Sequence, residues 1–141
     1  MTVPDNKVIA ALYIKGTELV PEDITAILGV SPTTSQARRQ ARLTSAGSTF
    51  VAKIGLWALV IERDNAGIST VMADLFEILG EHPTLANLTN VEEAYFDVFV
   101  ATLSDDDGDG ACEFQLSAIQ TAALAKYGLP VRFTVTMGND K

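Results

Sequence analysis

Hydrophobic positions along this chain follow two different periods, which predict short strands and short helices. Runs that are rich in aliphatic, β-branched and aromatic residues predict strands over residues 7–14, 54–62, 93–103 and 131–137. Apolar positions at i, i+3, i+4 spacing predict helices over 21–28, 68–79 and 116–127, and a glycine follows each of them. An acidic, glycine-containing turn over 104–110 predicts an antiparallel return strand over 111–115.

These elements predict a mixed α+β fold in the order β-α-β-α-β-β-α-β. The nearly continuous apolar run over 7–14 is typical of a central strand covered on both faces, and the alternation over 131–137 is typical of a half-exposed strand. We expect one domain over 1–141, a sandwich in which helices pack on a mostly antiparallel sheet. Two similar helix-to-glycine phrases suggest two related, ferredoxin-like halves.

Composition places the chain among folded proteins. Its 141 residues are 48% hydrophobic and 20% charged, enough apolar surface to offset the entropy cost of ordering a chain of this size. No apolar run approaches the roughly 18 residues that span a bilayer, and the first residues lack a basic stretch followed by an apolar one. We therefore expect a soluble, cytoplasmic protein without membrane contact.

The residue counts also limit the chemistry. Cys112 is the only cysteine and His82 the only histidine, so the chain offers no internal disulfide, no thiolate metal cluster and few nucleophile–base combinations. We expect no cofactor. A net charge of −8 disfavours nucleic acid as a partner and favours a basic protein.

One basic, polar segment follows the first predicted helix. Arg38 and Arg39 lie near Thr33 and Thr34, and arginine forks match the geometry of carboxylates and phosphates. Together with Trp57 these residues form a candidate anion or small-ligand site. The alternative is a solvated connecting loop, which we favour.

The acidic turn resembles the first half of a calcium loop. Asp105, Asp107 and Asp109 occupy positions one, three and five, and Gly110 position six. The bidentate glutamate expected at position twelve is replaced by Leu116, so a plain hairpin turn is the preferred interpretation.

A further set of carboxylates lies on or beside the third predicted strand. Glu92, Glu93 and Asp97 have the residue type of a catalytic carboxylate pair, but such chemistry needs a cleft and a defined separation. We expect these side chains to be exposed on a strand edge instead.

Four segments together resemble a bacterial family known as domain of unknown function 4279. They are residues 23–33 (DITAILGVSPT), 55–59 (GLWAL), 114–117 (FQLS) and 124–131 (LAKYGLPV). The resemblance covers most of the chain and implies a small α+β domain without established catalytic residues. For some members it also implies an immunity role beside toxins.

Two function hypotheses follow. The first is a non-catalytic interaction domain, in its sharper form an immunity-type or inhibitory protein that masks a basic partner. The second, from another class, is a small enzyme or ligand-binding domain that uses the Thr33-to-Arg39 loop and Trp57. A homo-oligomer formed through an exposed sheet edge, such as the last strand, is a third possibility.

Overall fold

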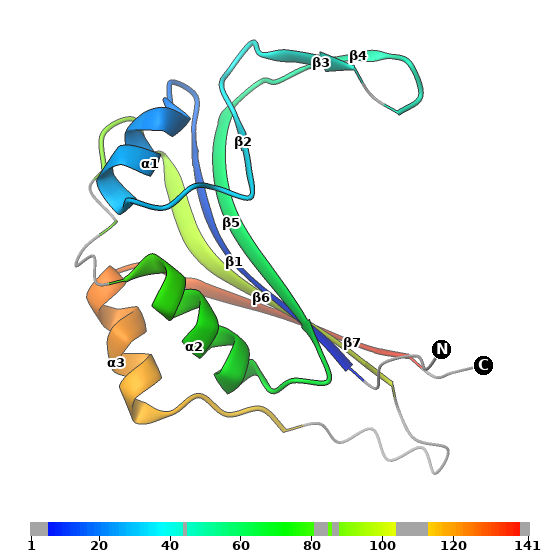
Figure 1. The fold of residues 1–141 in the computed structure, drawn as a ribbon, viewed down its shortest axis with the longest axis vertical. Coiled ribbons are helices and arrows are strands. Elements are labelled where there is room, and N and C mark those ends of the chain that lie inside the picture. The colour runs from blue at the N-terminus through cyan, green and yellow to red at the C-terminus, as the bar shows by residue number, and fades with distance from the viewer. Residues whose placement is uncertain (1–5, 44, 81–84, 86–87, 104–112, 139–141) are drawn as a thin grey trace.

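A five-stranded sheet, in the order β2-β5-β1-β6-β7, forms the centre of the molecule (Figure 1). The structure is a computed structural model that describes residues 6–43, 45–80, 85, 88–103 and 113–138. A separate two-stranded hairpin, β3-β4, projects from one end of the sheet. The strands are β1 (Asn6–Gly16), β2 (Thr34–Gln36), β3 (Ala41–Leu43), β4 (Thr49–Val51), β5 (Gly55–Asp64), β6 (Glu93–Leu103) and β7 (Val131–Gly138).

The first strand in the chain is the middle strand of the sheet. β1 pairs antiparallel with β5 on one side and with β6 on the other. β7 then pairs parallel with β6, after a crossover through a helix. The apolar run of β1 therefore has strand neighbours on both edges, as predicted for a central strand.

Three helices, α1 (Pro21–Leu28), α2 (Ile68–Leu79) and α3 (Ala118–Tyr127), have bounds close to the predicted ones. Gly29 and Gly128 end α1 and α3 in the left-handed conformation, with φ of 70° and 72°. α3 begins with a capping box, in which Ser117 and Gln120 satisfy each other's backbone N–H groups. Among the described residues no helix has both the length and the apolar character needed to cross a membrane.

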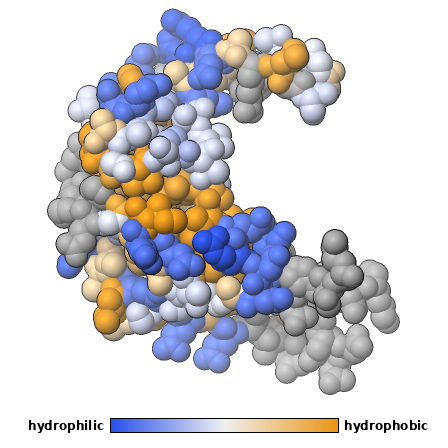
Figure 2. All heavy atoms as spheres, viewed as in Figure 1, coloured by the Kyte–Doolittle hydropathy of each residue, from blue (hydrophilic) through white to orange (hydrophobic). Residues whose placement is uncertain are grey.

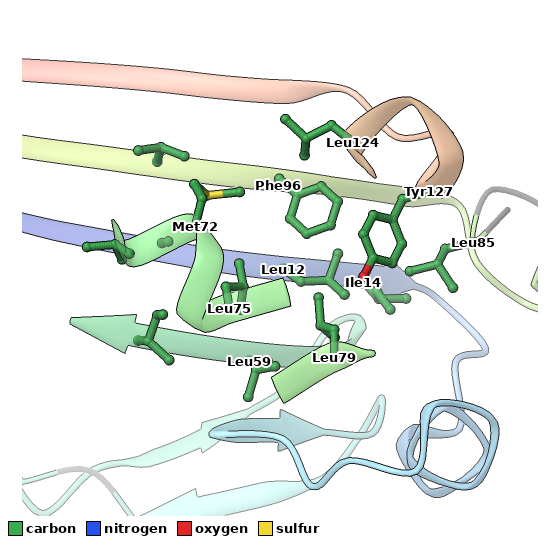
Figure 3. Close-up of a cluster of buried hydrophobic side chains, with 14 of the residues drawn as sticks. Leu12, Ile14, Leu59, Met72, Leu75, Leu79, Leu85, Phe96, Leu124 and Tyr127 are labelled. Carbon is green, nitrogen blue, oxygen red and sulfur yellow. The ribbon is translucent and has the colours of Figure 1, made fainter. Parts of the chain in front are cut away.

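All three helices lie against the same face of the sheet (Figure 1). Their buried side chains meet those of alternate strand residues in one core, part of which Figure 3 shows. Three rings join within this core: the Phe96 centroid lies 5.3 Å from that of Tyr127 and 6.1 Å from that of Phe76. The core residues with no more than 1% exposure are Val8, Ala10, Leu12, Ile14, Ile24, Trp57, Val71, Met72, Leu75, Leu79, Phe96, Val98 and Val100.

The structure confirms the predicted α+β class and the order of its main elements. It differs at 111–115: of these residues it describes 113–115, which lie outside any strand. The reason is that β7 occupies the edge of β6 where a returning antiparallel strand would pair. Phe114 and Leu116 pack against the core instead, on the way to α3.

The connection between α1 and β5 contains more structure than the sequence suggested. β2 extends the sheet beside β5, and β3 and β4 pair with each other as a hairpin. Each of these strands has three residues, too few to show a period. The expected loop is thus a short edge strand followed by a hairpin.

β7 lies at the edge of the sheet and exposes apolar side chains on its helix-side face. Phe133, Val135 and Met137 are 53%, 46% and 42% exposed. An unpaired edge with this character is a template for pairing with another chain. Self-association through the last strand stays a prediction.

Candidate functional site

The face of the sheet turned away from the helices, which we name the open face, carries none of the described helices (Figure 1). Figure 2 shows the molecule hollowed on this side, below the β3-β4 hairpin. Strand alternation and register assign to this face the side chains of Ile9, Ala11, Tyr13, Lys15, Leu56, Ala58, Val60, Glu62, Glu93, Tyr95, Asp97, Phe99, Arg132 and Thr134. β1 is therefore covered by helices on one face only, not on both as predicted.

A hollow of about 320 Å³ lies in the middle of the open face. The hollow forms at Ala11, which lies between Val60 and Asp97 in the register and has a side chain too short to fill the space. Larger neighbours form the walls around it. The residues that line the hollow are Ile9, Ala11, Tyr13, Asp97, Phe99 and Thr134.

Tyr95, next to the hollow, is surrounded by cations and by a second ring. The Arg132 guanidinium carbon lies 3.8 Å from the centroid of the Tyr95 ring, and Lys15 Nζ lies 3.0 Å from its hydroxyl oxygen. The Tyr13 ring is 5.5 Å away, tilted by 38°. These contacts cover Tyr95, which is only 5% exposed.

Asp97 has no counterion among the described residues. Its register neighbour on β7 is Arg132, but that guanidinium lies over Tyr95 and pairs with Glu93 at 3.3 Å. Lys15 donates to Tyr95. The Asp97 carboxylate is half-buried in the wall of the hollow, not exposed on a strand edge as predicted.

The charge of the Asp97 carboxylate also affects the pKa of the Tyr13 phenol. Burial raises the pKa of the Tyr13 phenol above its ordinary value of 10.0, and the negative charge of Asp97 and the neighbouring Tyr95 raise it further. Lys15 acts in the opposite direction and lowers the pKa. Tyr13 is therefore neutral at physiological pH and presents an uncharged ring to the hollow.

Trp57, one residue of the predicted ligand site, lies in the core on the helix side. Its side chain is fully buried, and its indole Nε1 donates to Thr25 Oγ1 at 3.0 Å. Thr34 is the register partner of Ala58, so its side chain is on the open face, opposite to that of Trp57. Thr33 stays at the edge of β5, where its hydroxyl bonds to the backbone N–H and carbonyl of Val60.

The two arginines of the same predicted site have other partners. Arg38 pairs with Glu18 at 2.8 Å. Arg39 adopts a positive φ of 69°, and its backbone N–H donates to the carbonyl of Ala52. The structure does not bring the arginines and Trp57 to one surface, and anion binding by this loop stays a prediction.

The predicted cation site lies outside the described residues. Asp105, Asp107 and Asp109 belong to that part of the chain, as do His82 and Cys112. Within the residues that the structure does describe, no group of three or more His, Cys, Asp or Glu side chains is arranged to hold a metal ion.

A family model matches this chain over residues 6–138, from the start of β1 to the end of β7. The family is described as domain of unknown function (DUF4279). The chain belongs to that family. A comparison with curated proteins finds no match, and neither does a comparison with solved structures. The resemblance predicted from four short segments is thus confirmed for nearly the whole chain.

Strand alternation in the sequence contains a signal for the open face. In β1 the residues facing the helices are Val8, Ala10, Leu12 and Ile14, so Tyr13 must point to the other side. In β7 the alternation already separated Arg132 and Thr134 from the apolar positions. What the sequence lacked was the register that sets these residues beside Asp97.

Proposed function

We propose that this protein is a non-catalytic interaction domain that binds a basic protein on its open face. One observation carries the proposal: the helices cover a single face of the sheet and leave Tyr13, Phe99 and Val60 on the other. A sheet face that carries aromatic and aliphatic side chains and has no covering layer is typical of a binding surface.

The charge of the chain supports a basic partner. A net charge of −8 gives a long-range attraction toward a positively charged protein, which raises the association rate at low salt. In the sharper form of the proposal, the domain masks its partner as an immunity-type or inhibitory protein does. The net charge is what supports this form.

Affinity capture with two variants of equal charge tests the proposal. Val60→Lys places a cation in the middle of the open face, and Ile119→Lys places one on α3, where the side chain is 82% exposed. Both variants must keep the circular dichroism spectrum and melting temperature of a folded protein. Each is used beside wild type as bait, at about 50 mM and about 500 mM salt.

We expect wild type and Ile119→Lys to recover the same basic protein at low salt, and much less of it at high salt. Val60→Lys should bind that protein at least about tenfold more weakly, measured with the purified partner by calorimetry. Equal capture by Val60→Lys, or recovery of no protein at low salt, would reject the proposed function.

A further inference from the structure

The hollow on the open face combines three features of a site for an organic cation. Tyr13 and Phe99 supply aromatic rings, Ile9 and Ala11 supply an aliphatic wall, and Asp97 supplies a negative charge. A cation is attracted to the face of an aromatic ring, and a desolvated carboxylate strengthens that attraction. The volume of about 320 Å³ is at the small end of the range for ligand pockets and is enough for one long side chain.

The neighbouring Tyr95 shows that this face already holds cations in the same way. The Arg132 guanidinium carbon lies over its ring at 3.8 Å from the centroid, and Lys15 contacts its hydroxyl and lies 5.2 Å from its centroid. Lys15 thus contacts Tyr95, and Arg132 contacts both Tyr95 and Glu93. Lys15 Nζ also lies 5.8 Å from the centroid of the Tyr13 ring, but within the described residues no cation pairs with the carboxylate of the hollow, Asp97.

The carboxylate decides between classes of occupant. An aliphatic or aromatic side chain in the hollow would remove water from Asp97 without giving it a partner, which costs free energy. An anion would be repelled. A cation on an aliphatic stem satisfies both the carboxylate and the apolar wall, because lysine and arginine side chains bury their stems and keep a charged end.

We propose that this hollow is an anchor site for a lysine or arginine side chain of the basic partner. The cationic end lies between the Asp97 carboxylate and the ring of Tyr13, and the stem lies along Ile9 and Ala11. This inference rests on the proposed function, since it names the chemical group by which the partner is held.

Small probes test the site without the partner. The full chain is titrated with Nα-acetyl-lysine methylamide, with its arginine counterpart and with the neutral Nα-acetyl-norleucine methylamide, and the ring resonances of Tyr13 and Phe99 are followed by NMR. Asp97→Asn removes the carboxylate charge. Glu77→Gln removes one charge from an exposed position on α2 and serves as the matched control.

We expect both cationic probes to shift the Tyr13 and Phe99 resonances saturably, in the millimolar range typical of a single contact. The norleucine probe should bind at least about fivefold more weakly. Asp97→Asn should weaken the cationic probes by about five- to tenfold, whereas Glu77→Gln should leave them unchanged. Equal binding of the neutral probe, or full binding by Asp97→Asn, would overturn the inference.

The outcomes separate the two proposals. A basic partner whose binding is lost in Val60→Lys but kept in Asp97→Asn leaves the proposed function standing and rejects the anchor site. Saturable, Asp97-dependent binding of the cationic probes without any captured partner supports the site and rejects the proposed function.

Discussion

The indole Nε1 of Trp57 donates a hydrogen bond to Thr25 Oγ1 at 3.0 Å, which ties β5 to α1 inside the core. Removal of the acceptor leaves a buried donor without a partner. We therefore expect Thr25→Val to lower the free energy of unfolding by about 1–3 kcal/mol, measured by urea denaturation. Thr25→Ser keeps the hydroxyl and should recover most of that loss. Equal stability of the valine variant and wild type would show that the bond contributes nothing.

Gly16 and Gly55 face each other at one end of the β1-β5 ladder, where no side chain fits. A Cβ on Gly16 would overlap the carbonyl oxygen of Asn90, and one on Gly55 would lie 2.8 Å from Leu19 Cβ. We expect Gly16→Ser to cost about 3 kcal/mol or more. Gly67→Ser adds the same atoms where nothing lies within 4 Å, at the N-cap of α2, and should be neutral or stabilising. Thermal unfolding of the two variants compares them directly.

Gln120 joins α2 to α3 and is the one buried polar residue of the described core. Its Oε1 accepts from Ser69 Oγ and from the Ser117 backbone N–H, and its Nε2 donates to the Ser69 carbonyl oxygen. Gln120→Leu breaks all three bonds at once and should destabilise the protein by about 1–3 kcal/mol. The neighbouring Ile119→Gln, on an exposed position, should change stability by less than about 0.5 kcal/mol. Denaturant melts of both variants measure the difference.

Tyr13 makes the stability sensitive to alkaline pH. Burial and Asp97 raise the pKa of the Tyr13 phenol in the folded state. The contribution of neutral Tyr13 to the stability of the folded protein is therefore complete below the ordinary pKa of 10.0, and it is lost as pH rises through the folded-state pKa. Tyr13→Phe should therefore flatten the fall in melting temperature above pH 10. Ultraviolet titration should show a lower Tyr13 pKa in Asp97→Asn, since one of its causes is removed. An unchanged titration curve in that variant would contradict the assigned role of Asp97.

Glu92 acts at the other end of the pH range. The backbone N–H of Thr17 donates to its carboxylate, and hydrogen bonding by Thr17 lowers the pKa of Glu92 below its ordinary value of 4.5. The stabilisation of the folded protein by this hydrogen bond is therefore present above pH 4.5 and is lost as pH falls below it. Wild type and Glu92→Gln should differ most at neutral pH and converge in acid. A difference that persists at pH 2 would point to another cause.

The long elements could be predicted because their patterns were set by burial in one core. α1 has the predicted bounds, and Ile24 and Leu28 are buried as the helical spacing required. Ile27, on the same predicted stripe, is 51% exposed. Only one face of so short a helix contacts the core, and the sequence could not define the width of that contact.

The open face could not be predicted because periodicity identifies apolar strand positions but not what covers them. The sequence predicted that β1 is covered on both faces, because Ile9, Ala11 and Tyr13 extend its apolar run. The helices pack only on the face opposite to these three side chains. Trp57 is the converse case: a sole tryptophan near a polar loop suggested a ligand contact, and the structure places its side chain in the core. Both outcomes depend on strand register, which is set by contacts between distant parts of the chain.

β1 is synthesised before the other strands of the described sheet, yet its pairing is completed late. Its two neighbours begin at Gly55 and Glu93, so the nascent chain must extend through Leu103 before both edges of β1 are paired. At a translation rate of about 5–20 residues per second this interval is roughly 4–17 s. During it Leu12 and Ile14 lack their partners on β6 and are available to chaperones at the ribosome. Premature termination anywhere before β6 would leave the middle of the sheet unfinished and expose the product to proteolysis.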